Sequence, residues 1–262
     1  MDKEILNTPV RRPLFLISND DGYNYGGIQA LIAVARQLGD VVVVAPGTHQ
    51  SGMASAITTT APVTAGRLID EPGFTVWTVN GTPADCVKLA CDQLLRDRLP
   101  DLVLTGINHG FNAGLSTIYS GTMGCAFEGL AHGLPSIAFS LGSYALDADF
   151  SPCVPYIRRI VERVLEFGLP AGVCLNVNFP VGEILGLRVT TTAMGRWINE
   201  YEHRVNPSGM DYYWIQGDYR CDDPRDTATD IYWLDRGWAT VTPCHLDQTD
   251  HATMSQISEL LL

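Results

Sequence analysis

The sequence of 262 residues is poor in basic side chains and lacks the cysteine spacings typical of zinc-binding or disulfide-bonded domains. Its 17 lysines and arginines stand against 29 aspartates and glutamates, which gives a formal net charge of −12. Binding a nucleic-acid backbone requires clustered basic side chains, so no nucleic-acid partner is expected. The seven cysteines are odd in number and form no Cys-x-x-Cys pair. They therefore favour buried free thiols over a disulfide framework or a zinc site.

Long apolar runs and two common nucleotide-binding motifs are also missing. No apolar stretch approaches the roughly 20 residues of a membrane span, so no membrane partner is expected. The segment 1–12 is charged and has no apolar stretch ahead of a cleavage site, and together with the free thiols this predicts a cytoplasmic protein. Neither G-x-G-x-x-G spacing nor Gly-Lys-Ser/Thr occurs, which disfavours a dinucleotide site and a Walker A loop.

Strand-like and helix-like segments alternate through the first two-thirds of the chain. Continuous apolar or β-branched runs predict strands, and apolar residues at helical spacing predict helices. Alternating elements of this kind predict a Rossmann-like α/β/α fold of three layers around a mostly parallel sheet. The expected strands cover 14–18, 41–45, 75–79, 101–105, 136–140 and 173–178, and the expected helices cover 26–39, 83–98, 121–132 and 154–167.

The character of the sequence changes after about residue 185. Tyrosine and tryptophan concentrate there, strands are expected at 187–192, 212–215 and 238–242, and helical spacing returns only at 255–262. We therefore expect a Rossmann-like core over 1–185 and a β-rich C-terminal extension over 186–262 that completes the single domain. The aromatic residues favour an arm that contacts another subunit, although a hairpin packed on its own domain fits nearly as well.

The first expected strand is followed by Asn19-Asp20-Asp21-Gly22, which places two carboxylates side by side. Open parallel sheets bind ligands beyond the carboxyl ends of their strands. Adjacent carboxylates repel unless a cation neutralises them, and hard cations such as Mg²⁺ prefer oxygen ligands. Taken alone, the motif fits a turn in which one aspartate caps the next helix at least as well.

Polar residues follow two further strands. Ser51 lies in the loop after 41–45 and can ligate a metal or cap a helix, while His49 beside it can act as a base or as a supporting group. The glycine-rich loop 106–114 contains Asn108 and Asn112, whose side-chain oxygens are hard ligands. Such loops approach ligands closely because glycine lacks a side chain.

The segment Tyr119-Ser120-Gly121-Thr122 opens the helix expected at 121–132. Backbone N–H groups at a helix start, with hydroxyl groups beside them, bind anions such as phosphate, although simple helix capping explains Ser120 and Thr122 as well. A metal site and a phosphate site in one crevice together indicate phosphoryl hydrolysis.

In the order and spacing of these motifs the chain resembles the survival protein E (SurE) family of metal-dependent 5′/3′-nucleotidases, from Leu14 nearly to its end. The matching stretches are Ser18-Asn19-Asp20-Asp21-Gly22, Ala45-Pro46 with Gln50-Ser51-Gly52, Asn80-Gly81-Thr82-Pro83-Ala84-Asp85-Cys86, Thr105-Gly106-Ile107-Asn108-His109-Gly110, Tyr119-Ser120-Gly121-Thr122, and Val241-Thr242-Pro243 with Asp247.

The resemblance implies hydrolysis of nucleoside monophosphates with one divalent cation, Mg²⁺ or Mn²⁺, per subunit. It implies Asp20, Asp21, Ser51 and Asn108 as metal ligands, and homodimers or homotetramers built through the C-terminal extension. The resemblance also implies phosphate contacts by Ser120, Gly121 and Thr122. We expect Asn112 to be a further phosphate contact. The loop Gly47-Thr48-His49-Gln50 departs from the family, since many members carry a more charged stretch there.

We expect Asp21 and Asp20 to be the catalytic residues, with Asp21 orienting the water that attacks phosphorus in line. Two alternatives remain open from the sequence. The substrate can be another small phosphoester or short polyphosphate, or the crevice can bind nucleotides without turnover.

Overall fold

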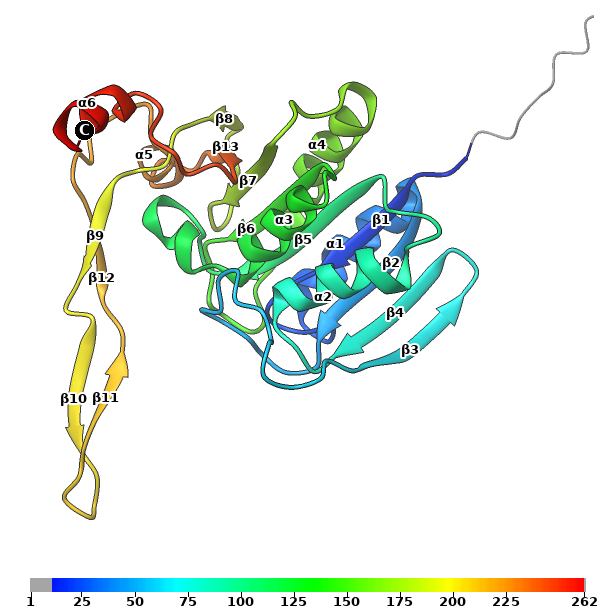
Figure 1. Cartoon of the computed structure of the whole chain (residues 1–262), viewed down its shortest axis with the longest axis horizontal. Coiled ribbons are helices and arrows are strands. Elements are labelled where there is room, and N and C mark those ends of the chain that lie inside the picture. Colours follow the sequence, from blue (N-terminus) through cyan, green and yellow to red (C-terminus); the bar gives the residue numbers. More distant parts are fainter. Residues whose placement is uncertain (1–10, 262) are drawn as a thin grey trace, which may run out of the picture.

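The computed structural model describes residues 11–261, in which a nine-stranded sheet lies between two layers of helices (Figure 1). The segment 1–10, for which no leader is expected, and Leu262 lie outside the described residues. All neighbouring strands pair in parallel except β3 with β4 and β13 with β7. The order across the sheet is β3 (Ala65–Glu71), β4 (Phe74–Val79), β2 (Asp40–Pro46), β1 (Leu14–Ser18), β5 (Leu102–His109), β6 (Ser136–Leu141), β7 (Val173–Phe179), β13 (Ala239–His245) and β8 (Leu187–Val189).

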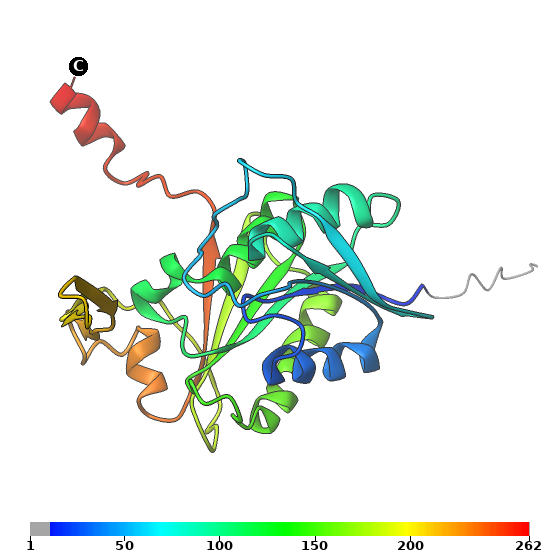
Figure 2. The same ribbon diagram turned by 90° about the horizontal axis from the view of Figure 1, so that it is seen from below.

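Helices cover both faces of the sheet, as Figure 2 shows. On one face α1 (Gly26–Leu38) packs against α4 (Val154–Phe167), and on the other α2 (Pro83–Leu89) packs against α3 (Gly121–Ala131). Every residue of β1 and β6 is buried, which is typical of parallel strands covered on both sides. The three-layer, mostly parallel fold predicted from the sequence is confirmed.

The chain leaves β1 in one direction and β5 in the other. From β1 it proceeds to β2 and β4, whereas from β5 it proceeds to β6 and β7 on the opposite side. Connections that part in this way leave a crevice at the carboxyl ends of the two central strands. The Asp20-Asp21 pair and the glycine-rich loop follow these two strands, so the topology brings them to the same crevice.

The start of α2 was correctly predicted, but its end was not. Thr82 and Asp85 form a reciprocal capping box around Pro83 at the first turn. The helix was expected to continue to about residue 98, yet α2 ends at Leu89 and a π-helical turn, η1 (Ala90–Leu94), replaces its last part. The chain must turn there to reach β5, where Asp101 and Leu14 exchange hydrogen bonds of 2.7 and 2.8 Å.

The C-terminal part contains more regular structure than its sequence predicted. Two antiparallel ladders form a long hairpin arm that projects from the core (Figure 1): β9 (Gly195–Ile198) with β12 (Asp218–Cys221), and β10 (Tyr201–Val205) with β11 (Asp211–Ile215). A short helix, α5 (Asp230–Leu234), was not expected, whereas α6 (Met254–Leu261) was. The strand expected at 212–215 is confirmed as β11, whereas β9, β10 and β12 were not expected.

The domain boundary predicted near residue 185 stays a prediction. Beyond it, β8 and β13 complete one edge of the central sheet, while the arm and α6 stand apart from the core (Figure 2). Every residue of α6 is exposed. The remaining short helices are η2 (Gly114–Tyr119) and η3 (Ser151–Cys153).

The expected free thiols are confirmed, since all seven cysteines are unpaired and five are buried. Burial raises the pKa of the Cys91 thiol to about 11 and that of Cys153 to about 12. None of the helices within residues 11–261 combines the length and the apolar composition needed to cross a bilayer.

Candidate active site

The turn after β1 is built by its own asparagine and glycine. The Asn19 amide donates to the Gly22 carbonyl and accepts from the Gly22 N–H, both at 3.1 Å. Gly22 has φ of +109°, a conformation that side-chain-bearing residues rarely adopt. The tight turn buries Asp20 and Asp21, which are 3% and 4% exposed. Two carboxylates are thus held almost out of water at the carboxyl end of a central strand.

Asp20 lies against the start of α3. Its Oδ1 accepts a hydrogen bond of 2.5 Å from the Thr122 hydroxyl, and its Oδ2 receives none from the described residues. Burial raises the pKa of Asp20 from 3.8 to about 6, and the neighbouring charge of Asp21 adds to the rise although the Thr122 hydrogen bond opposes it. The carboxylate therefore carries an electrostatic cost that a nearby cation would remove.

Asp21 lies between two imidazole rings. Its Oδ2 is 3.0 Å from His109 Nδ1, and its Oδ1 is 3.3 Å from His49 Nδ1. The His49 side chain is 49% exposed, whereas that of His109 is 8% exposed. Beside Asp21 a pocket of about 220 Å³ opens, lined also by Tyr23, Tyr25, His49 and residues of the loop after β2.

The loop after β2 is tied to the aspartate turn. The Gln50 N–H donates to the Asp20 carbonyl at 2.7 Å, which brings the exposed Ser51 toward the same crevice. The Ser51 hydroxyl lies 2.7 Å from His49 Nε2. Asp21, His49 and Ser51 are therefore linked through one imidazole ring.

Asn108 sits at the end of β5, after a register shift between Thr105 and Asn108 in the pairing with β6. Its side-chain Nδ2 donates to the carbonyls of His109 and Gly110 at 3.2 and 3.0 Å. These two hydrogen bonds fix the amide, and its Oδ1 receives no hydrogen bond from the described residues. Asn108 thus offers a free oxygen one residue before the imidazole that contacts Asp21.

The start of α3 packs directly on Asp20. Ser120 caps the helix by accepting from the Met123 N–H at 3.0 Å. A Cβ at Gly121 would lie 2.8 Å from the Asp20 Cβ and 3.0 Å from Pro83, so only glycine fits there. The N–H groups of Gly121 and Thr122 have no partner within their own helix, because the first turn of any helix leaves them free. An anion can bind them beside the carboxylate pair.

Asn112 is buried and hydrogen-bonded to two strands of the sheet. Its side-chain Nδ2 donates to the Ser140 hydroxyl at 2.8 Å, and its N–H donates to Asn178 Oδ1 at 2.8 Å. Its carbonyl accepts from Asn176 Nδ2 at 2.7 Å. The structure therefore shows Asn112 anchoring the glycine-rich loop on β6 and β7.

The donor groups fit a hard divalent cation. Asp20, Asp21, Asn108 and Ser51 offer carboxylate, amide and hydroxyl oxygens, the ligands that Mg²⁺ and Mn²⁺ prefer. Within residues 11–261 no group of three or more His, Cys, Asp or Glu side chains is arranged to hold a metal. A cation here would therefore depend on the serine and the asparagine as well as on the carboxylate pair.

His109 is the site residue that sequence reasoning missed. It follows Asn108 directly, but a lone histidine in a glycine-rich loop carries no signal of its contact with a residue 88 positions earlier. The strand register, not the motif, determines that contact.

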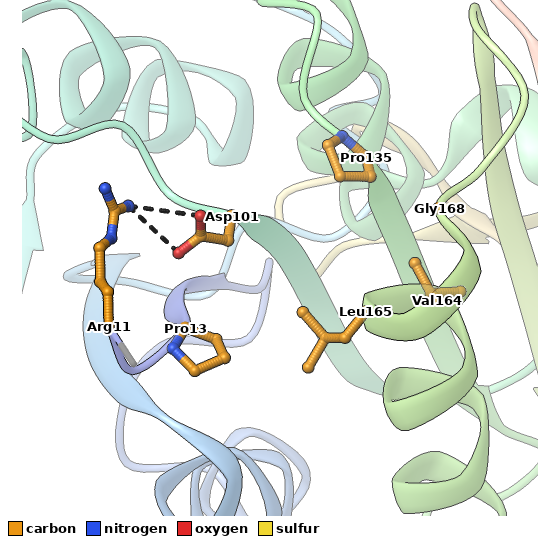
Figure 3. Close-up of a pocket in the computed structure, with 7 residues that line it drawn as sticks. All are labelled: Arg11, Pro13, Asp101, Pro135, Val164, Leu165 and Gly168. Atoms are coloured by element: carbon orange, nitrogen blue, oxygen red, sulfur yellow. Dashed lines mark hydrogen bonds and ion pairs between the residues drawn. The ribbon is translucent and has the colours of Figure 1, made fainter. Parts of the chain in front are cut away.

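A larger pocket, of about 600 Å³, lies at the opposite end of the strands, where the chain enters β1, β5 and β6 (Figure 3). Its one ion pair joins Arg11 to Asp101 at 3.3 Å, and the rest of its lining includes Pro13, Pro135 and Leu165. The carboxylate pair is at the other end of β1, so this pocket is separate from the candidate site.

The fold and the carboxylate-lined crevice define an α/β protein with a candidate metal and phosphate site. The family model described as Survival protein SurE matches residues 15–199. The chain therefore belongs to the SurE family.

Several relatives match nearly the whole chain. A protein of Bacteroides fragilis named 5′-nucleotidase SurE is 44% identical over 248 residues, which cover 94% of this chain and 97% of that protein. A protein of the same name from Phocaeicola vulgatus is 43% identical over 247 residues, with 94% and 96% covered. The crystal structure of the SurE protein from Aquifex aeolicus superposes with a TM-score of 0.82 at 39% identity, covering 95% of this chain and 99% of that one.

Proposed function

We propose that this protein is a metal-dependent phosphatase that hydrolyses nucleoside 5′-monophosphates, and 3′-monophosphates where the crevice admits them, to nucleoside and phosphate. The observation that carries the proposal is the buried Asp20-Asp21 pair. The pair lies at the carboxyl end of β1, where the connections from β1 and β5 part, and against the start of α3. The relatives named 5′-nucleotidase support the choice of substrate.

The proposed cofactor is one divalent cation, Mg²⁺ or Mn²⁺, per subunit. Asp20, Asp21, Ser51 and Asn108 would hold it, since each offers an oxygen at this crevice. A cation bound there would neutralise charge on the phosphoryl oxygens and favour attack by water. The raised pKa of Asp20 supports this assignment, because within residues 11–261 Thr122 alone donates a side-chain hydrogen bond to the buried carboxylate.

The proposed phosphate contacts are Ser120, Gly121 and Thr122, with Asn112 behind them. The free N–H groups at the start of α3 would stabilise the negative charge that develops on the phosphoryl oxygens. Asn112 would contribute by holding the loop in place, since its backbone and amide are bonded to β6 and β7.

Asp21 is proposed to orient the attacking water and to accept its proton. An Asp21→Asn variant keeps the size of the side chain but loses the charge. We expect it to release no measurable phosphate from AMP while its melting temperature stays close to that of the unmodified protein. Near-full activity in a folded Asp21→Asn protein would rule out this role.

The decisive experiment is phosphate release from a panel of 5′- and 3′-nucleotides, sugar phosphates and short polyphosphate. Each is measured with Mg²⁺, with Mn²⁺ and with EDTA. The proposal requires EDTA-sensitive release from nucleoside monophosphates. Nucleotide binding without release would instead identify a binding module, and faster release from another phosphoester would reassign the substrate.

We further propose a cytoplasmic homodimer or homotetramer that assembles through residues 186–262. The free cysteines support the compartment. Exposed apolar side chains on the arm, including Tyr213, Trp214 and Ile215, support assembly. Light scattering coupled to gel filtration measures the mass, and a monomer at micromolar concentration would contradict the proposed assembly.

A further inference from the structure

We propose that His109 is a positioning residue that anchors one oxygen of Asp21 through its imidazole N–H and thereby leaves the other oxygen facing the crevice. The inference rests on the proposed function, because it assigns a task to Asp21 in that site. It concerns a residue that the expected metal and phosphate contacts leave out.

The two oxygens of Asp21 have different surroundings. Oδ2 is 3.0 Å from Nδ1 of His109, whose side chain is 8% exposed. Oδ1 is 3.3 Å from Nδ1 of His49, whose side chain is 49% exposed and lines the pocket beside Asp21. Oδ2 therefore points toward the protein interior, and Oδ1 is the oxygen that a cation or an attacking water can reach.

The His109 ring is held by its neighbours. Phe150 meets it edge-on with the ring centres 5.1 Å apart, and Tyr25 does so at 6.0 Å. The next residue, Gly110, donates its N–H to the Leu141 carbonyl at 2.8 Å, which fixes the backbone beside the ring. A ring confined in this way gives the Nδ1–H a fixed direction.

The hydrogen-bond partners assign the tautomer. Nδ1 faces a carboxylate, which only accepts, so Nδ1 carries the proton. His109 Nε2 is buried and has no partner among the described residues. A proton on Nδ1 satisfies the Asp21 contact, while Nε2 faces the rings of Phe150 and Tyr25 without a hydrogen-bond partner among the described residues.

Space filling alone does not account for this residue. A hydrocarbon side chain would fill the same volume without burying a nitrogen that lacks a partner, and such a nitrogen is unfavourable. The contact with Asp21 is therefore the feature that requires a histidine. Outer partners of this kind orient metal ligands, and their loss typically lowers metal affinity or activity 10- to 100-fold.

Three substitutions test the inference. In His109→Asn the amide nitrogen occupies the position of Nδ1 and keeps the donor. In His109→Gln the amide nitrogen occupies the position of Nε2, and in His109→Leu the donor is lost. His132→Leu is the matched control, because it removes a histidine–carboxylate contact of 3.1 Å with Glu128 at the far end of α3.

Two quantities are measured on the full chain: Mn²⁺ affinity of the metal-free protein by titration calorimetry, and kcat and KM for AMP. We expect His109→Leu and His109→Gln to weaken Mn²⁺ binding and to lower kcat by about tenfold or more. We expect KM to change little. His109→Asn should stay within about threefold of the unmodified protein for both quantities, and His132→Leu should match it.

The inference is overturned if His109→Leu is folded and lies within about twofold of the unmodified protein in both measurements. It is also overturned if His109→Asn is folded yet as impaired as His109→Gln. If His109→Leu does not fold, the comparison of the Asn and Gln variants decides. Absence of EDTA-sensitive activity in the unmodified protein would instead reject the proposed function, and calorimetry would still report on His109.

Discussion

Asp20→Asn should stabilise the metal-free protein, although the aspartate belongs to the candidate active site. The rise of the Asp20 pKa from 3.8 to about 6 means that the unfolded chain releases the proton more readily than the folded protein. The ionised carboxyl therefore lowers the free energy of unfolding by about 3 kcal/mol above pH 7. The effect falls to about half of that at pH 5 and disappears below about pH 3.8.

The asparagine removes the charge and keeps an oxygen that can accept from the Thr122 hydroxyl. Its amide nitrogen would replace Oδ2 and would be a buried donor without a partner. That unsatisfied donor costs about 1–2 kcal/mol and offsets part of the gain. The net stabilisation expected for Asp20→Asn near pH 7.5 is therefore about 1–2 kcal/mol. The difference between the two proteins should shrink by about half of the charge effect when the pH is lowered to about 5.

Urea unfolding in EDTA, followed by the fluorescence of the five tryptophans, measures this difference at both pH values. Addition of Mn²⁺ near pH 7.5 should then stabilise the unmodified protein by mass action and leave Asp20→Asn unchanged. A difference that does not vary with pH would refute the reasoning, because it would mean that the buried charge of Asp20 is not what limits stability.

Two further substitutions test the supports of the site. Gly121→Ala places a methyl group 2.8 Å from the Asp20 Cβ, so we expect activity to fall at least tenfold and the free energy of unfolding to fall by about 1–3 kcal/mol. Phosphate release and urea unfolding measure these effects, and an unchanged protein would show that α3 can move away. Asp85→Ala removes the capping box and the hydrogen bonds that Thr58 donates to the carboxylate. It should lower the free energy of unfolding by about 1–2 kcal/mol. Burial opposes the ionisation of Asp85, but the hydrogen bonds from Thr58 and Thr82 outweigh it and lower the pKa, so this stability is lost only as the pH falls below 3.8. Urea unfolding above and below that pH measures this stabilisation. Equal stability of the unmodified protein and Asp85→Ala at neutral pH would show that the hydrogen bonds of Asp85 do not stabilise the fold.

The sequence predicted the parts of the fold that local patterns control. Buried parallel strands read as continuous apolar runs, and helix starts such as Thr82-Pro83 carry their caps in the sequence, so these elements were found. The exposed strand β3 and the ladders of the arm are stabilised by pairing between segments. Of these strands only β11 was predicted, from the aromatic run at 212–215. β3 is exposed along most of its length, so no alternation of apolar and polar residues marks it.

The same distinction applies to the site. The rule that ligands bind at strand ends predicted that Asp20, Asp21, Ser51 and Asn108 share one crevice, and their common metal role stays a prediction. The rule was not enough to pair His109 with Asp21, or to place the Asn112 amide on Ser140, because these contacts depend on register and on the direction of individual side chains. The mostly parallel sheet was inferable from the sequence, whereas side-chain partners were not.

The polar groups below the crevice and those facing it differ in how fully they are satisfied. Below it, Asn178 Nδ2 donates to Asn176 Oδ1 at 2.9 Å, and Asn176 Nδ2 donates to the Asn112 carbonyl at 2.7 Å. This buried network fixes the loop that follows Asn108. Above it, Oδ2 of Asp20 and Oδ1 of Asn108 receive no hydrogen bond from the described residues. A rigid, fully bonded base therefore holds under-coordinated oxygens in place, which is the arrangement that a cation would complete without moving the chain.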